Sequence, residues 1–426
     1  MDTIYNSTKS SWLVKATPFF YGWVILAAGT IGVIIMGPSQ TFTVGVFIDS
    51  FIQAFGISRA NVSLIYGLAT LGGSLLLPVT GRLVDRYGAS RMIIFVTLGL
   101  GLSVAGIGLT QGVVSLFVGL LAVRYFGFGS MQLVVNNAIA QWFIRRRGMV
   151  MGIAGLSLAA GLMIYPVLAE FLINRVDWRG AWFVLGLSVL LIMLPVGWFF
   201  IKDKPEQYGL HPDGDPDVLT DSLGQVSEEN WTLAEARQTG AFWIFAAALS
   251  VMTMIMAGLV FHQISLFEVR GLSRETGVIA FNIMAICSII GNLGMGALLD
   301  RYSARLLLSG VLFLLATTLV WVQFITTPLQ GFLFSGMVGL VSGSFRVMDS
   351  VVWAKYYGRL HLGSIKGATM IGVIGATSLG PYPLGFSYDH FGSYGPALNS
   401  FLVLPLLIGI VTFFIKRPEK QNLTHS

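Results

Sequence analysis

The sequence predicts an all-α membrane protein with twelve transmembrane helices in two pseudo-symmetric six-helix bundles. Three observations predict this fold class. The chain of 426 residues is 55% hydrophobic and only 11% charged, whereas soluble domains carry about 25% charged residues. Apolar stretches of spanning length recur along the chain, and a charged motif that follows one of them is repeated later. Most of the surface must therefore face lipid rather than water.

The apolar stretches give the number of helices. A helix needs about 20 apolar residues to cross about 30 Å of hydrocarbon. Several stretches are longer than this, which predicts tilted helices or helices that extend past the headgroups. The twelve stretches cover residues 19–48, 58–80, 91–111, 113–141, 148–172, 180–201, 240–267, 275–299, 305–325, 328–355, 363–387 and 394–415.

Basic residues predict the orientation. Loops after even-numbered spans and both tails hold most of the arginines and lysines. The positive-inside rule therefore predicts an inner (plasma) membrane protein with both termini in the cytoplasm. The net charge of +6 comes from these loops. Because the basic residues lie between apolar spans, the lipid bilayer is the expected partner and nucleic acid is not.

One long polar stretch divides the chain. Residues 202–239 contain Pro, Gly and acidic residues and no long apolar run. This composition predicts a cytoplasmic linker between an N-terminal bundle, residues 1–201, and a C-terminal bundle, residues 240–426.

A repeated motif supports the two-bundle division. The segment GRLVDRYGASR follows the second span, GALLDRYSAR follows the eighth, and their aspartates, Asp85 and Asp300, lie 215 residues apart. Gly148 and Gly363, which open the spans after two basic loops, keep the same offset. Two matches in one register indicate duplication.

The motif predicts contacts between helix ends. Its glycines are expected to allow close helix packing, its aspartates to accept hydrogen bonds at helix N-termini, and its arginines to engage carboxylates or helix C-termini. Such contacts can break and re-form, which suits a gate; the alternative is a topology signal with loop packing only. The candidate gating residues are Gly81, Asp85, Arg86 and Arg91, and Gly296, Asp300, Arg301 and Arg305.

Charges inside spans are candidate functional residues, because a buried charge in a bilayer is costly without a partner. Arg346 and Asp349 share one face of the tenth span. We expect Arg346 to receive an anionic substrate group and Asp349 to bind a driving proton. The alternative is an intrahelical salt bridge, with Asp349 extending toward the cytoplasm.

Other polar residues in the spans add candidates. Arg124 lies near the middle of the fourth span, on which Gln132 and Asn136 share a face. Arg124 is expected to bind substrate or influence a nearby carboxyl group, or to anchor its helix to backbone carbonyls. Ser288 and Asn292 on the eighth span are candidates for hydrogen bonds to substrate.

Two further features are open to more than one interpretation. Gly37-Pro38 interrupts the first span just before Gln40, and broken helices often mark transport sites, although a simple kink is the alternative. His262 on the seventh span is a candidate proton relay, or a hydrogen-bonded structural residue or part of an outer gate.

Several classes of chemistry have no motif here. The chain has no Walker-type loop, dinucleotide fingerprint, nucleophile elbow or metal-ligand spacing. No cofactor, metal or catalytic residue is predicted, and the chain is not expected to be an enzyme. ATP-driven pumping by this chain alone is excluded, which leaves transport driven by a gradient.

At these motifs the chain resembles the major facilitator superfamily. That family carries the Gly-x-x-x-Asp-Arg motif between helices 2 and 3 and again between helices 8 and 9, and LLAVRYFGFGSM, with Arg124, is similar to its helix-4 motif, whose arginine is often tied to proton coupling. The resemblance covers nearly the whole chain. It implies alternating access, in which two bundles rock about a site at the membrane midplane.

The chain is similar in particular to the monocarboxylate transporter and oxalate:formate antiporter branch. The segments that carry this likeness are Tyr21-Gly22-Trp23, WFIRRRGMVMGIAG, PEQYGLHPDG, YYGRLHLGSIKG and GPYPLGFSYDHFGSYGPA. The likeness also implies that Gln40 contacts substrate. Two features depart from this branch: Asn292 stands where it commonly has a helix-8 arginine, and residues 368–387 carry no lysine.

These observations favour a gradient-driven transporter of a small organic anion, with a monocarboxylate as the expected substrate and protons as a candidate coupling ion. Arg346 is then the expected replacement for the absent helix-8 arginine. The alternative is an exporter of amphipathic drugs or metabolites. A membrane sensor without transport is a third class, which the short tails and linker disfavour. One chain suffices for the architecture, so a monomer is expected.

Overall fold

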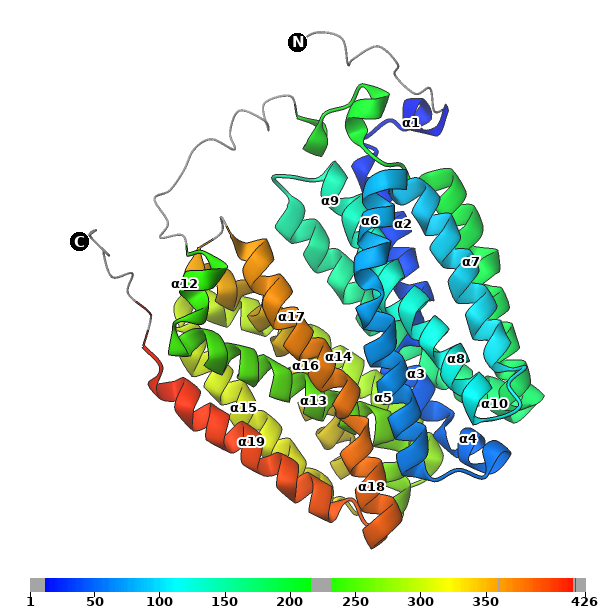
Figure 1. Ribbon diagram of the computed structural model, residues 1–426, viewed down its shortest axis with the longest axis vertical. Coiled ribbons are helices and arrows are strands. Elements are labelled where there is room, and N and C mark those ends of the chain that lie inside the picture. Colours follow the sequence, from blue (N-terminus) through cyan, green and yellow to red (C-terminus); the bar gives the residue numbers. More distant parts are fainter. Residues whose placement is uncertain (1–11, 216–230, 359–360, 417, 419–426) are drawn as a thin grey trace. The chain divides into compact units, whose positions relative to one another are not determined.

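The computed structural model describes residues 12–215, 231–358, 361–416 and 418, and every regular element in them is a helix. The predicted all-α fold class is therefore confirmed. The chain divides into two compact units (Figure 1). Unit 1 comprises Met1–Phe55 and Leu68–Gly224, and unit 2 comprises Gly56–Gly67 and Gln225–Ser426. A short segment of the first half, Gly56–Gly67, thus packs within unit 2.

The first half of the chain forms a broken first span and then long helices. Its elements are α1 (Trp12–Ala16), α2 (Gly22–Ile35), η1 (Gly37–Ser39), α3 (Thr41–Val46), α4 (Ile48–Phe55), α5 (Arg59–Leu75), α6 (Leu77–Tyr87), α7 (Ala89–Ile107), α8 (Val113–Val123), the π-helical η2 (Arg124–Met131), α9 (Gln132–Trp142) and α10 (Arg147–Phe200).

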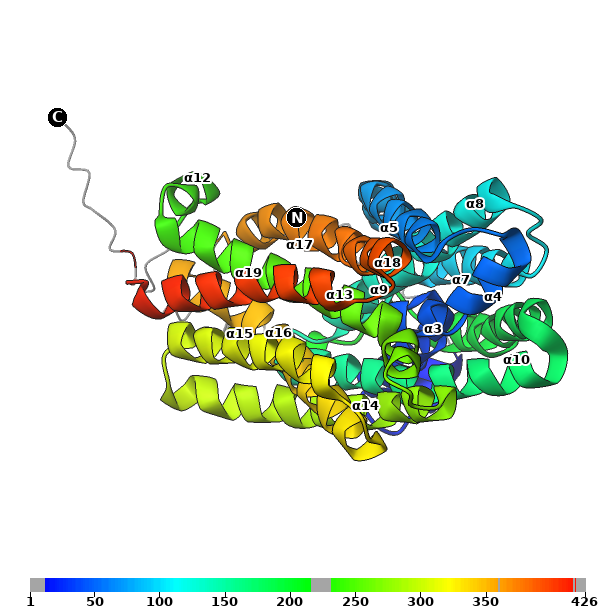
Figure 2. The ribbon, with the colours of Figure 1, turned by 90° about the horizontal axis from the view of Figure 1, so that it is seen from below.

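The second half contains short turns followed by the remaining spans. Its elements are η3 (Pro205–Tyr208), η4 (Pro212–Gly214), α12 (Leu233–Arg237), α13 (Gly240–Val269), α14 (Arg274–Arg301), α15 (Ala304–Trp321), η5 (Val322–Phe324), α16 (Pro328–Tyr357), α17 (Leu362–Leu379), α18 (Pro381–Phe391) and α19 (Gly395–Phe414). In unit 2, α14 packs on α16, and α15 and α19 run side by side (Figure 2).

Ten helical stretches in the described residues are long and apolar enough to cross a membrane. One of them, Met149–Phe200, has 52 residues and leaves helical geometry at Val176 and Asp177, where φ of Asp177 is 64°. It therefore supplies two spans, joined by a turn and not by the loop expected between 172 and 180. The first span, α2 through α3, is too interrupted to qualify as one helix, and it completes the predicted twelve.

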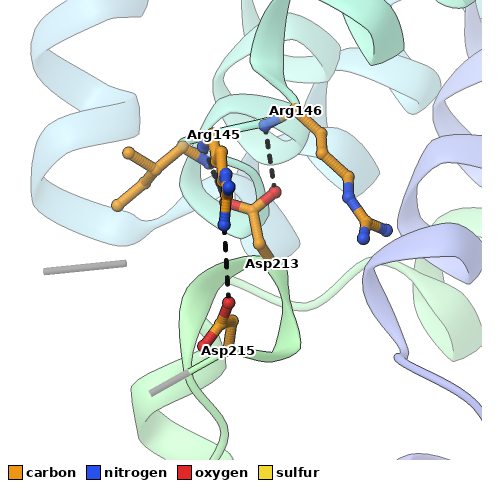
Figure 3. Close-up of polar contacts among 5 residues, drawn as sticks. Arg145, Arg146, Asp213 and Asp215 are labelled. Carbon is orange, nitrogen blue, oxygen red and sulfur yellow. Dashed lines mark hydrogen bonds and ion pairs between the residues drawn. The ribbon is translucent and has the colours of Figure 1, made fainter. Parts of the chain in front are cut away.

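The first part of the predicted linker folds onto unit 1 (Figure 3). Asp213 occupies the left-handed region at φ 58°. Its carboxylate accepts the backbone N–H groups of Ile144, Arg145 and Arg146 at 2.8, 2.7 and 3.1 Å. Asp215 lies 3.8 Å from the Arg145 guanidinium. The linker thus holds the loop that precedes α10.

A second linker carboxylate caps another helix of unit 1. Asp203 accepts the N–H and the hydroxyl of Ser90, both at 2.8 Å, at the start of α7. Gly88, at φ 80°, is required here because a Cβ atom would lie 2.4 Å from the Asp203 carboxylate. Burial, together with the charge of Asp203, raises the pKa of Tyr208 in the adjacent turn.

Aromatic rings join the linker to the helix ends. Trp142 contacts Tyr21 and Tyr208, with ring centroids 5.4 and 6.5 Å apart, and its indole N–H donates to the Lys202 carbonyl. Phe20 packs edge-on to Phe143 at 5.5 Å. Three segments that carry the family likeness, around Tyr21, Trp142 and Tyr208, therefore meet in one cluster. Residues 216–230 of the predicted linker lie outside the described residues, and Trp231 onward packs in unit 2 through the Tyr357 carbonyl.

Candidate functional site

In unit 1 the polar centre forms where the first span breaks. Pro38 and its neighbours form a single 3₁₀ turn, Gly37–Ser39, between α2 and α3, which confirms the predicted interruption. The N–H of Thr43 bonds to the Gln40 carbonyl at 3.1 Å, not to the Ser39 carbonyl as an unbroken helix would require. The break therefore leaves the Ser39 carbonyl open to a side-chain donor.

Arg124 supplies that donor. Its Nη1 donates to the Ser39 carbonyl at 2.6 Å, and its Nε donates to the Thr70 hydroxyl at 3.0 Å. The guanidinium carbon lies 3.9 Å from the Phe128 ring centroid, a cation–π contact. The side chain is 1% exposed. Arg124 thus ties η2 to the broken first span and to α5, which fits the anchoring interpretation.

Small residues make this approach possible. A Cβ atom on Gly127 would lie 2.3 Å from the side chain of Ser39, and one on Gly73 would lie 2.9 Å from the backbone nitrogen of Tyr125. The glycines of the RYFGFG segment therefore serve close packing between η2 and its neighbours. The segment Arg124–Met131 is wound as a π-helix. This geometry is rare, and where it occurs within a helix it is frequently found at functional sites.

The other predicted polar residues of unit 1 lie near this centre in sequence but bond locally. Gln132 Nε2 donates to Asn136 Oδ1 at 3.1 Å along one face of α9, as their spacing predicts. Gln40 is buried, and among the described residues its amide nitrogen has no hydrogen-bond partner. A buried amide donor without a partner is costly, which distinguishes Gln40 from Gln132 and Asn136.

In unit 2 the site is built on the packing of α14 against α16. A Cβ atom on Gly343 would lie 2.0 Å from the Ser288 carbonyl, and one on Gly339 would lie 2.2 Å from the Met284 carbonyl. In the reciprocal contact, a Cβ atom on Gly291 of α14 would lie 2.5 Å from the Leu340 carbonyl of α16. The two backbones can approach this closely only because these positions lack side chains.

This packing places Arg346 opposite Ser288. Nη2 of Arg346 lies 3.5 Å from the Ser288 hydroxyl, the outer limit for a hydrogen bond. Ser288 is 2% exposed, and Asn292 is half-buried one turn further along α14. Asn282 on the same helix has a buried side-chain oxygen without a hydrogen-bond partner in the described residues. A cation and neutral polar groups thus lie together on two adjacent spans.

Asp349 forms an ion pair with the next helix. Its Oδ2 lies 3.2 Å from Nζ of Lys366 on α17. Lys366 lies in the second turn of α17, within the predicted span 363–387. Both side chains are about one-third exposed, at 34% and 33%.

His262 is fully buried within α13 and joins two other segments of unit 2. Its Nε2 lies 2.9 Å from the Pro381 carbonyl and 3.2 Å from the Ser63 hydroxyl. A carbonyl oxygen can only accept, so Nε2 carries the proton. Gln263 donates to the Gly277 carbonyl at 3.1 Å. These contacts fit a hydrogen-bonded structural residue at the place where the segment Gly56–Gly67 packs.

A carboxylate that the sequence reasoning missed fastens the same segment. Asp389 accepts the N–H of Ala60 at 2.6 Å, in the first turn of α5. The Arg59 guanidinium carbon lies 5.0 Å from the Tyr388 ring centroid, and Tyr66 stacks on Phe261 at 4.6 Å. Asp389 lies in the segment SYDHFG, which carries the family likeness, and the signal within that segment is a carboxylate at the end of a predicted span.

The repeated motif lies at helix ends, as predicted, but its glycines do not pack as expected. A Cβ atom on Gly81 or Gly296 would meet nothing within 4 Å, so the close-packing expectation is wrong for these two positions. The side chains of Asp85, Arg86, Arg91, Asp300 and Arg301 are exposed. Arg305 donates to the Ile415 carbonyl at 2.7 Å, the expected contact with a helix C-terminus, here that of α19.

Residues 29–381 match the family model described as Major Facilitator Superfamily. The chain belongs to the major facilitator superfamily. It is therefore a multi-pass membrane protein of a transporter family, and the fold and family predicted from the sequence are confirmed.

Relatives within the superfamily differ in what their names state. The chain is 24% identical to monocarboxylate transporter 12 of Rattus norvegicus over 95% of this chain and 87% of that protein. It is also 24% identical to multidrug resistance protein MdtG of Dickeya zeae (strain Ech586), over 70% of this chain and 72% of that protein. The uncharacterized transporter YhjX of Escherichia coli (strain K12) is 24% identical over 71% and 75%.

A solved structure shares the superfamily fold. The bacterial homologue of the human lysosomal transporter Spinster, in an inward-facing and occupied conformation, superposes with a TM-score of 0.71. The match covers 93% of this chain and 97% of that chain at 14% identity. At this identity the likeness supports the fold alone.

Proposed function

We propose that the chain is a secondary active transporter of a small organic anion, a monocarboxylate, that works by alternating access. It is driven by an ion gradient, with protons as the coupling ion. The single observation that carries the proposal is Arg346, a cation within a membrane span whose guanidinium lies beside the hydroxyl of Ser288. An intramembrane cation needs a functional reason.

A carboxylate substrate suits this arrangement. An arginine presents several N–H donors to a carboxylate, and Ser288 and Asn292 offer neutral hydrogen bonds to the rest of a small molecule. A single cation matches a single carboxylate, whereas a dicarboxylate would leave one charge without a counter-ion in the low-dielectric interior. The match to monocarboxylate transporter 12 extends over 95% of the chain and supports the same substrate class.

Asp349 provides a place for the coupling proton. It shares a face of α16 with Arg346 and pairs with Lys366 on α17. Protonation removes the negative charge, weakens the ion pair with Lys366, and so links proton binding to the relative position of two spans. Arg124 and His262 are second candidates for coupling, through their bonds to the broken first span and to α18.

The proposal includes orientation and assembly. Both termini and the linker lie in the cytoplasm of a cell whose plasma (inner) membrane holds the protein, because the basic loops share one side. One chain contains all the spans, so the monomer is the transporting unit.

A second candidate function is export of amphipathic drugs or metabolites. The similarity to MdtG and to a multidrug efflux pump PmrA homologue of Lactococcus lactis, at the same 24% identity, favours it. These matches cover only 70% of the chain.

Purified protein in proteoliposomes tests the two functions against each other. We expect accumulation of labelled lactate, pyruvate or acetate that rises when a pH gradient is imposed and collapses with a protonophore. Uptake of cationic dyes into inverted vesicles, without monocarboxylate transport, would instead establish the export function. Binding of a monocarboxylate without any flux would replace transport with sensing.

A further inference from the structure

A basic pocket opens on unit 2 where four spans end. Its cavity volume is about 550 Å³. Its lining comes from the turn between α14 and α15, the first turn of α15, the last turn of α16, and Lys416, two residues beyond the end of α19. The lining residues with polar side chains are Tyr302, Ser303, Arg305, Lys355, Tyr356 and Lys416.

Three cations, those of Arg305, Lys355 and Lys416, line this pocket, and none of the lining residues that the structure describes carries a carboxylate. Arg305 gives one hydrogen bond to the Ile415 carbonyl, and Lys355 gives one to the Leu299 carbonyl. Arginine has five N–H donors and lysine three, so each contact leaves further donors. Lys416 is exposed at the rim. Like charges brought together repel one another, and an anion relieves that repulsion.

The start of α15 adds a second source of positive potential. This helix has 18 residues, and the side chain of its N-cap residue, Ser303, accepts no capping hydrogen bond. Unsatisfied N–H groups at a helix N-terminus favour an anion, and a phosphate in particular. The hydroxyl groups of Ser303, Tyr302 and Tyr356 at the lining are further donors.

Apolar side chains lead away from the pocket along the membrane-facing surfaces of α15 and α19. Leu306 is 40% exposed, and Phe414, next to the pocket residues in sequence, is 72% exposed. Leu407, Ile410 and Val411 continue the exposed apolar surface of α19, and the two helices run side by side (Figure 2). A soluble anion gains nothing from this apolar surface, whereas an acyl chain packs favourably against it.

We propose that this pocket binds the phosphate headgroup of an anionic phospholipid, with its acyl chains lying along α15 and α19. Basic pockets between spans are a known physical basis for such recognition. The pocket contains none of the residues proposed to bind substrate, so lipid binding can be tested independently of the identity of the transported solute.

Competition binding with the full-length protein in detergent tests the proposal. The probe is a fluorescent phosphatidylglycerol, displaced by unlabelled phosphatidylglycerol, by phosphatidylcholine of the same acyl chains, or by inorganic phosphate. We expect phosphatidylglycerol to compete about tenfold or more better than phosphatidylcholine, and less so at high salt. Lys355→Gln and Lys416→Gln should each weaken binding about fivefold, and together about twenty-five-fold.

Lys204→Gln, which removes an exposed charge of the linker, is the matched control and should leave affinity unchanged. Lys416 follows the last helix, so its variant keeps the test usable if Lys355→Gln unfolds. Equal binding of the two lipids, or an unchanged affinity in the double variant, would overturn the proposal. Inorganic phosphate competing as well as phosphatidylglycerol would assign the pocket to a soluble anion and overturn the lipid assignment.

Discussion

Nη1 of Arg124 donates to the Ser39 carbonyl across 2.6 Å, at the point where the first span leaves α-helical geometry. The break and the arginine are complementary, because one exposes an acceptor within the membrane and the other satisfies it. A proline interruption and a buried cation, which look like two separate anomalies in the sequence, form one structural unit in the protein.

Arg124→Lys should weaken the link between η2 and the broken first span. A lysine ammonium cannot reproduce the two directions in which the guanidinium bonds to Ser39 and Thr70, so one buried acceptor loses its donor, at a cost of about 1–3 kcal/mol. We expect a lower thermal unfolding midpoint and at least about a tenfold fall in transport rate. Arg145→Lys, at an exposed site, is the control. An unaltered midpoint would show that the two bonds contribute little.

Gly343→Ala should separate α14 from α16. The new Cβ atom would lie 2.0 Å from the Ser288 carbonyl, so the backbones must move apart, which costs about 1–3 kcal/mol. Because Ser288 moves with that backbone, Arg346 loses its neighbour and the apparent KM for an anionic substrate should rise. Gly294→Ala on α14 meets nothing within 4 Å and is expected to be neutral or slightly stabilising. Equal effects of the two substitutions on stability would contradict the packing argument.

Asp213→Asn tests whether the linker holds the loop before α10. Asparagine tolerates the same left-handed backbone, but its amide offers one acceptor oxygen, and not two, to the three N–H groups of residues 144–146. We expect destabilisation of about 1–3 kcal/mol and faster proteolysis within 144–146 and 202–215. Asp215→Asn removes the negative charge of an exposed ion pair and should change stability by less than about 1 kcal/mol. Unchanged proteolysis in Asp213→Asn would show that the loop is held by other contacts.

Asp389→Asn tests the fastening of Gly56–Gly67 within unit 2. A neutral acceptor binds the Ala60 N–H more weakly than a carboxylate does, by about 1 kcal/mol, so the open population of the segment should rise about fivefold. Thiol labelling of Val62→Cys, buried in this structure, reports that opening in a Cys287→Ser background. Glu275→Gln, at an exposed carboxylate of the same unit, is the control. Labelling that stays at the parent rate in Asp389→Asn would argue against the fastening role.

Hydropathy predicted the fold, because the length and apolar character of each span follow from the physics of a bilayer acting on the chain locally. The break at Gly37-Pro38 was equally visible, since proline removes a backbone donor wherever it stands. The sequence could not reveal the partners of the charged residues. Lys366 lies 17 positions after Asp349, and only the packing of α16 and α17 brings the two side chains together.

The contacts of the linker are a second feature that the sequence did not predict. Its Pro, Gly and acidic composition predicts a linker between the bundles and gives no partners for its carboxylates, yet Asp203 and Asp213 bind backbone N–H groups at two helix starts in unit 1. Composition reports how a segment behaves in water, whereas these carboxylates find donors supplied by distant parts of the chain. The expected packing at Gly81 and Gly296 failed for a related reason: a glycine permits close approach but does not bring a neighbour.

The most direct test of the account is the initial rate of labelled pyruvate uptake by Arg346→Gln in proteoliposomes under an inward proton gradient. Arg237→Gln, at an exposed arginine of α12, is the matched control. If Arg346 receives the substrate carboxylate, uptake by Arg346→Gln falls at least about tenfold, corresponding to more than about 1.4 kcal/mol of binding, while the control matches the parent. Parent-level pyruvate uptake by a folded Arg346→Gln protein would contradict the account.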